Sequence, residues 1–247
     1  MSVFSTALRD LASAQKSSKG APAYSRYVNR KLGRVLAASA FALGRTPHQV
    51  TALSGTFSFA GIALIALVRP GWAMAVGVCL CLVLGYALDA ADGQLARLRG
   101  GGSKSGEWLD HIVDSAKISS LHAAVLVSYF RFFEPEQSWR LLIPLGFGVV
   151  AAVLFFAMIL NDQLRRAHQA ASGLPPAPPA PASALRSLLV IPTDYGFLCV
   201  AFLLLGAPKI FEPVYGFFFA ANALFLLAAL VKWFKDISAL DRPLVAA

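Results

Sequence analysis

Long uncharged apolar runs alternate with short polar segments along most of the chain. A helix needs roughly 20 mostly apolar residues to cross the core of a bilayer. Six runs approach that length, so the pattern predicts six membrane-spanning helices in an all-α integral membrane bundle. Their approximate bounds are 50–68, 72–88, 109–133, 141–160, 188–205 and 211–233.

Residues 24–45, just before the first run, have a different pattern. Apolar side chains recur there at helical spacing with basic residues beside them, which predicts an amphipathic interfacial helix on the inner leaflet. Packing of the same helix against the bundle is compatible with that placement. The apolar positions are Tyr24, Tyr27, Val28, Leu32, Val35 and Leu36.

The remaining segments set the domain boundaries. Residues 1–23 are too polar for the apolar core of a signal peptide, and we expect a mobile tail that stays in the mature protein. One membrane domain covers residues 46–236. Within it, residues 174–183 are rich in proline, which fixes φ and removes amide donors, so they predict a cytoplasmic linker. Residues 237–247 form a C-terminal tail.

Composition supports the membrane assignment. Charged residues make up 14% of the chain, against about 25% in a typical soluble protein. The net charge of +9 is spread over the segments between apolar runs, and no nucleic-acid-reading motif accompanies it. A cationic membrane protein that faces anionic lipid explains the charge without nucleic acid. Cys79, Cys81 and Cys199 all lie in apolar runs, where we interpret them as small apolar packing residues.

The distribution of lysine and arginine predicts the orientation. Most of the 22 basic residues fall in segments that share one side if the N-terminus is inside. The opposite side holds only Arg69, Arg131, Arg140 and Lys209, and Lys117 lies within the third run. We therefore expect a multi-pass protein of the cell membrane with both termini, and the connection between runs two and three, in the cytoplasm.

Carboxylates gather where the second run ends and the third begins. Asp89 and Asp92 are three residues apart, and Asp110 and Asp114 are four apart, so each pair shares one helix face. Helices joined by a short connection are neighbours, which brings the four aspartates together. Oxygen ligands without nearby Cys or His clusters favour Mg²⁺ or Mn²⁺. Two such ions, about 3.5–4 Å apart, would clamp a phosphoryl group, and one remaining carboxylate could accept a proton.

The segment between the pairs suits a phosphate ligand. Gly93 allows a close approach of backbone, and Arg97 can donate two hydrogen bonds to phosphate. Residues 100–103, Gly-Gly-Gly-Ser, offer amide donors and a hydroxyl before the next helix. A cation pathway lined by aspartates, as in a divalent-cation transporter, is the alternative from another functional class.

Together these residues resemble the sequence D-x₂-D-G-x₂-A-R-x₈-G-x₃-D-x₃-D of the CDP-alcohol phosphotransferase (phosphatidyltransferase) family. All eight positions are filled, by Asp89, Asp92, Gly93, Ala96, Arg97, Gly106, Asp110 and Asp114. The resemblance implies that Asp89, Asp92 and Asp110 hold two Mg²⁺ or Mn²⁺ ions and that Asp114 is the general base. It also implies that Gly93, Arg97 and Ser103 contact the CDP group, and that the protein is a homodimer.

Residues 46–51, Thr-Pro-His-Gln-Val-Thr, are similar to a second family stretch, T-P-N/D-x-V-T, which borders the nucleotide. Thr46, Pro47, His48 and Gln49 are therefore candidate contacts of the CDP donor. His48 replaces the usual Asn or Asp, so its own contact is open between the nucleotide and the membrane interface.

The resemblance implies transfer of a phospho-alcohol group from a donor such as CDP-diacylglycerol to an acceptor alcohol, with release of CMP, in phospholipid biosynthesis. Transfer of a small CDP-linked alcohol to a lipid acceptor is the alternative. Arg165, Arg166 and Arg186 could bind an anionic acceptor or only flank the membrane, and Asp194 could bind acceptor hydroxyls or cap a helix. The arginine pattern typical of relatives that use inositol phosphate or glycerol phosphate is missing. This argues against a phosphatidylinositol phosphate synthase and leaves a phosphatidylglycerophosphate-type or another acceptor open.

Overall fold

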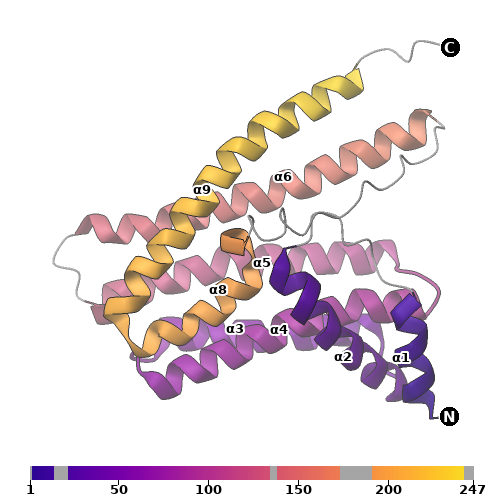
Figure 1. The fold of residues 1–247 in the computed structure, drawn as a ribbon, viewed down its shortest axis with the longest axis horizontal. Helices are drawn as coiled ribbons and strands as arrows, with labels where there is room; N and C mark the ends of the chain where they lie inside the picture. Colours follow the sequence, from indigo (N-terminus) through magenta and orange to yellow (C-terminus); the bar gives the residue numbers. More distant parts are fainter. Residues whose placement is uncertain (1, 14–21, 134–137, 173–190, 242–247) are drawn as a thin grey trace.

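The computed structural model describes residues 2–13, 22–133, 138–172 and 191–241, and the regular structure in these residues is helical (Figure 1). The predicted linker at 174–183 and Arg186 lie outside them. The main helices are α1 (Val3–Ser13), α2 (Arg30–Ala42), α3 (Pro47–Leu67), α4 (Trp72–Leu98), α5 (Lys104–Ser128), α6 (Leu142–Ser172), α8 (Tyr195–Ala201) and α9 (Pro208–Ser238).

Short turns of other helix types extend several of them. A π-helical turn, Ser25–Asn29, leads into α2, and another, Tyr129–Phe133, follows α5. The 3₁₀ turns are Ser138–Leu141, Ile191–Thr193, Phe202–Gly206 and Ala239–Asp241. Residues 237–241 of the predicted C-terminal tail are thus helical and continue α9.

Four helices of the described residues are long and apolar enough to cross a membrane: α3, α4, α6 with the turn before it, and α9. Of the six predicted spans, the third corresponds to α5, whose first half carries charged side chains. The fifth corresponds to the short apolar segment Tyr195–Gly206, which begins next to residues outside the description. The structure thus supports a multi-pass membrane protein, and the number six stays a prediction.

Helix α3 packs against both α4 and α5, and these three helices run side by side (Figure 1). Its small residues permit this, because a Cβ atom on Gly61 would lie 3.1 Å from the Cβ of Cys81 on α4. A buried apolar cluster joins the three helices to α8 and α9, and it includes Ile65, Leu82, Leu121, Leu198 and Phe211. Helices α6 and α9 diverge from this core toward their C-terminal ends, at the right of Figure 1.

Helix α2 lies on α4. A Cβ atom on Gly33 would come within 2.9 Å of the Cβ of Ala90, and Ala37 and Ala38 are buried. The opposite face of this segment is apolar and exposed, at Tyr27, Val28, Leu32 and Val35. The helix therefore packs on the bundle, and contact of its exposed face with the membrane stays a prediction.

The expectation of a mobile tail over residues 1–23 is wrong for residues 3–13, which form α1. Ala7 and Leu11 are fully buried against α2 and α4. Apolar residues recur every three or four positions in this segment, which is the spacing of an amphipathic helix. The polar composition of residues 1–23 as a whole masks that signal.

Candidate active site

Three carboxylates converge between α4 and α5. One oxygen each of Asp89, Asp110 and Asp114 lies within 4.8 Å of the others. Asp110 and Asp114 share a face of α5 because they are four residues apart, as the sequence predicts. Asp89 reaches them from α4. The predicted convergence of aspartates from two helices is thus present for these three residues.

Close packing between helices sets this geometry. A Cβ atom on Gly85 of α4 would overlap the hydroxyl of Ser58 on α3 and lie 3.2 Å from the carbonyl oxygen of Ser54. On the other side of α3, a Cβ atom on Gly55 would lie 3.4 Å from Val113 of α5. Because α3 contacts both partners through small residues, it holds the carboxylate-bearing faces of α4 and α5 at a short, fixed separation.

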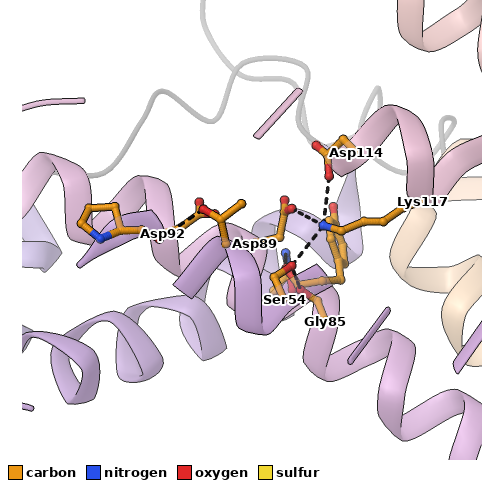
Figure 2. A network of polar contacts seen from close by, with 10 residues as sticks. Ser54, Gly85, Asp89, Asp92, Asp114 and Lys117 are labelled. Carbon is orange, nitrogen blue, oxygen red and sulfur yellow. Dashed lines mark hydrogen bonds and ion pairs between the residues drawn. The ribbon is translucent and has the colours of Figure 1, made fainter. Parts of the chain in front are cut away.

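Lys117 lies between the aspartates and is only 5% exposed. Its ammonium group donates to Oδ1 of Asp89 over 2.7 Å and to Oδ1 of Asp114 over 3.0 Å (Figure 2). A third hydrogen bond of 3.0 Å goes to the hydroxyl of Ser54, which in turn donates to the carbonyl oxygen of Gly85. The sequence placed Lys117 inside a span without assigning it a role. An ionisable residue at that depth is itself a signal of a functional site.

Asp92 lies one turn further along α4, on the far side of Asp89 from Lys117 (Figure 2). It is buried, and its Oδ2 accepts a 2.6 Å hydrogen bond from the hydroxyl of Thr51 on α3. It lies outside the group of three converging carboxylates. Thr51 occupies one oxygen of Asp92 and leaves Oδ1 free of that contact. Sequence reasoning did not identify Thr51 as the residue that holds Asp92, or Ser54 as a partner of Lys117.

The three carboxylates fit a divalent cation. Ligand oxygens around Mg²⁺ lie about 2.1 Å from the ion and hence about 3–4 Å from one another. Oxygens within 4.8 Å therefore need only small side-chain rotations to coordinate one ion. With a single lysine among several carboxylates, the local charge is negative, which favours a cation. The all-oxygen ligand set suits Mg²⁺ or Mn²⁺.

The predicted CDP-contacting residues lie at the starts of α3 and α5. Thr46 and Gln49 form a reciprocal capping box, with hydrogen bonds of 3.1 and 3.3 Å, and Pro47 occupies the first turn of α3. His48 is exposed, and its ring lies beside Gly106 of α5. The hydroxyl of Ser103 caps α5 by accepting from the amide of Gly106 over 3.0 Å. These caps explain the local structure, and nucleotide contact stays a prediction.

The glycine-rich connection ends at these caps. Gly100 and Gly101 have φ angles of 95° and 130°, which favour glycine, so the chain needs them to turn from α4 toward α5. Gly93 and Arg97 lie on the last turns of α4, and the Arg97 guanidinium would be 3.6 Å from a Cβ atom on Gly93. The absent side chain of Gly93 thus leaves room beside Arg97.

The candidate acceptor residues form ion pairs or caps. Arg165 pairs with Asp236 of α9 at 2.9 Å, and Arg166 pairs with Glu107 of α5 at 2.7 Å and with Asp162. Asp194 is buried and caps α8, accepting from the amide of Gly196, while its other oxygen accepts from the amide of Tyr24. Of its two predicted roles, helix capping is the one that the structure contains.

A cavity of about 150 Å³ lies between α5, α6, α8 and α9. Ile118, the residue after Lys117, lines it together with apolar side chains such as Leu121, Phe155 and Leu198. His122, Asp194 and Asn222 add the polar part of its wall. The bundle therefore contains a largely apolar space beside α5.

Two solved structures have a similar fold, and both are of the phosphatidylinositol phosphate synthase of Mycobacterium tuberculosis. The complex with manganese and citrate has a TM-score of 0.55 and 19% identity, covering 85% of this chain and 92% of that chain. The structure with CDP-DAG bound has a TM-score of 0.55 and 20% identity, covering 88% of this chain and 99% of that chain. No curated protein sequence matches this chain.

A family model matches most of the chain. The CDP-alcohol phosphatidyltransferase model covers residues 45–234, which include α3, α4 and α5 and all the converging aspartates. Membrane-spanning helices, the complete aspartate pattern and this match agree with one another. The chain therefore belongs to the CDP-alcohol phosphatidyltransferase family of enzymes, transferases of substituted phosphate groups in phospholipid synthesis.

Proposed function

We propose that this enzyme transfers a phosphatidyl group from CDP-diacylglycerol to an acceptor alcohol and releases CMP. The observation that carries the proposal is the convergence of Asp89, Asp110 and Asp114 on α4 and α5, two helices within the region that the family model matches. The apolar cavity beside α5 is consistent with a lipid substrate. The structural neighbour from M. tuberculosis binds CDP-DAG, and the donor is assigned here by that likeness.

Asp89, Asp92 and Asp110 would hold two Mg²⁺ or Mn²⁺ ions, and Asp114, which converges on Asp89 and Asp110, would be left to accept a proton. For Asp92 this role uses the oxygen that Thr51 does not occupy. Bound divalent ions neutralise phosphoryl oxygens and the leaving phosphate. The residues at the starts of α3 and α5, together with Gly93 and Arg97, would hold the CDP half of the donor.

In the proposed reaction, Asp114 takes the proton from the acceptor hydroxyl. The hydroxyl oxygen then forms a bond to the β-phosphorus of the donor, and the bond from that phosphorus to the oxygen of CMP breaks. One oxygen of Asp114 contacts Lys117, and the other can receive the proton. Orientation of the two substrates supplies much of the rate in such a displacement.

The site would face the cytoplasm. The connection between α4 and α5, the N-terminal helices and the C-terminal ends of α6 and α9 lie toward one end of the bundle, at the right of Figure 1. Most of the basic residues fall in these segments, which supports a cytoplasmic placement by the positive-inside rule.

Purified enzyme tests the proposal. With Mg²⁺ or Mn²⁺ and a panel of acceptor alcohols, we expect CMP release from CDP-diacylglycerol and a new phospholipid that mass spectrometry identifies. Release only from small CDP-linked alcohols with a lipid acceptor would reassign the donor. Metal flux into liposomes without any CMP release would instead indicate a divalent-cation transporter.

Asp114→Asn tests the base. Removing a general base costs about 10²–10⁴-fold in turnover, and we expect a loss of CMP release in that range. Size-exclusion chromatography checks that the variant is folded. Asp162→Asn, a change of the same kind at an exposed carboxylate on α6, serves as the control. Turnover of Asp114→Asn close to that of the wild type would remove Asp114 from the proposed mechanism.

A further inference from the structure

We propose that Lys117 is the built-in counter-ion of the carboxylate site. Its ammonium group holds Asp89 and Asp114 together, and it positions Asp114 for the reaction. The part that concerns Asp114 rests on the proposed function, whereas the counter-ion role stands on geometry alone.

The first argument is the hydrogen bonding of the ammonium group. A lysine has three N–H donors, and all three are used, by Asp89, Asp114 and Ser54 at 2.7, 3.0 and 3.0 Å. A buried lysine is costly unless it is paired and hydrogen-bonded, and here both conditions hold. The contacts come from three helices, α3, α4 and α5 (Figure 2).

The second argument is the hydrogen bond from Lys117 to Ser54, an uncharged residue that fixes the position of the ammonium group. The hydroxyl of Ser54 donates to the carbonyl oxygen of Gly85 over 2.9 Å, so it presents its lone pairs to Lys117. Both the hydroxyl of Ser54 and the ammonium of Lys117 are buried. Lys117 is therefore aimed at one point by the packing of α3 on α4, and a flexible surface ion pair lacks such a constraint.

The third argument is that the lysine and a metal ion can share the same carboxylates. Lys117 contacts Oδ1 of Asp89 and Oδ1 of Asp114. Each carboxylate keeps a second oxygen that Lys117 does not contact. The ammonium can thus stay in place when an ion binds, holding Asp114 by one oxygen, while its positive charge weakens the attraction of the site for the ion.

Two opposite consequences follow for Lys117→Met, which keeps the length and apolar stem and removes the charge. Loss of one unit of nearby positive charge should tighten binding of Mn²⁺ alone about 3- to 10-fold, as judged for partly screened charges. Loss of positioning should lower the turnover about 10-fold or more, with little change in the KM for CDP-diacylglycerol. A purely structural lysine would not give tighter metal binding together with slower turnover.

The experiment measures Mn²⁺ binding to the purified full-length protein by electron paramagnetic resonance, and CMP release in parallel. Lys209→Met, an exposed lysine at the start of α9, controls for the change in net charge. Lys117→Arg keeps the charge and should retain the Mn²⁺ affinity of the wild type. Lys117→Gln also removes the charge but keeps a polar group that can hydrogen-bond to Ser54, and it tests the inference by the same tightening of Mn²⁺ binding if Lys117→Met does not fold.

Unchanged or weaker Mn²⁺ binding in folded Lys117→Met, or in Lys117→Gln when the former does not fold, would overturn the counter-ion role. The two proposals fail separately. Suppose that the wild type has no transferase activity but that Mn²⁺ binds more tightly when Lys117 is replaced by Met. This result would contradict the proposed function and support the counter-ion role of Lys117. An active wild type whose Lys117→Met variant binds Mn²⁺ with unchanged affinity would support the proposed function and contradict the counter-ion role.

Discussion

At the scale of single residues, Asp89, Asp92 and Asp114 each have a defined side-chain partner. Thr51 of α3 holds Asp92, and Lys117 holds Asp89 and Asp114. The sequence pattern supplies the carboxylates, and these neighbours set which oxygen of each remains for a ligand. Orientation of a ligating carboxylate by a second hydrogen bond is a common way to tune a metal site.

Thr51→Val tests whether the hydroxyl of Thr51 holds the carboxylate of Asp92 in place. Loss of the hydroxyl leaves Oδ2 of a buried carboxylate without that donor, which should cost about 1–3 kcal/mol of stability and lower metal-dependent CMP release. Thr56→Val on the same helix is the matched control, because Thr56 is exposed and its hydroxyl donates to the carbonyl of Ala52 within its own helix. Equal thermal midpoints for the two variants in detergent would contradict a special role for Thr51.

At the scale of elements, α3 organises the site although it carries none of the four aspartates. Its small residues let α4 and α5 approach on either side, and it supplies Thr51 and Ser54. The first turn of α3 also lies beside the start of α5, through His48 and Gly106. Any change that moves α3 away from α4 should therefore separate Asp89 from the carboxylates of α5.

Gly85→Ala is the sharpest test of this packing. The new Cβ atom would meet the backbone of α3 at 3.1 and 3.2 Å as well as the hydroxyl of Ser58, and backbone cannot rotate away. We expect a lower thermal midpoint and weaker Mn²⁺ binding, with an overpacking cost of about 1–3 kcal/mol.

Gly77→Ala on the same helix is the control. Its Cβ atom would make an ordinary contact of 3.7 Å with Leu64, so the change should be neutral or slightly stabilising through helix propensity. Equal loss of stability in both variants would show that glycine content, rather than close approach of α3, matters at position 85.

At the scale of the whole molecule, charge and topology agree on one orientation. The aspartates lie in the second half of α4 and the first half of α5, on either side of the connection between these helices. The N-terminal helices and the C-terminal ends of α6 and α9, which hold many of the basic residues, lie toward the same end as this connection (Figure 1). The exposed apolar side chains of α6 and α9, such as Phe156, Leu224 and Phe234, are explained by lipid contact or by the second subunit of the predicted homodimer.

Cysteine labelling tests the orientation. In a background without Cys79, Cys81 and Cys199, Lys104→Cys should react with a membrane-impermeant maleimide only after cells are permeabilised. Lys209→Cys, on the predicted outer side, should react in intact cells. The opposite pattern would reverse the assigned topology and place the site outside.

The sequence predicted the helical class and most helix positions because apolar runs are long and their ends are marked by charge, proline or glycine. It did not predict α1, since Ala7 and Leu11 acquire an apolar environment only when α2 and α4 supply it. Nor did it decide the role of Asp194, whose oxygens meet the amides of Tyr24 and Gly196. The contact with Tyr24 joins residues 170 positions apart, and periodicity carries no information about such a pair.

The family, the helical faces of the aspartates and the preference for an oxygen-ligated divalent ion follow from the sequence alone, because residue type and helical spacing fix them locally. Only the tertiary structure decided which carboxylates meet, and it placed Lys117 between Asp89 and Asp114. The reason is physical: three helices had to pack through small residues before a buried ammonium could contact carboxylates of two of them and a serine of the third.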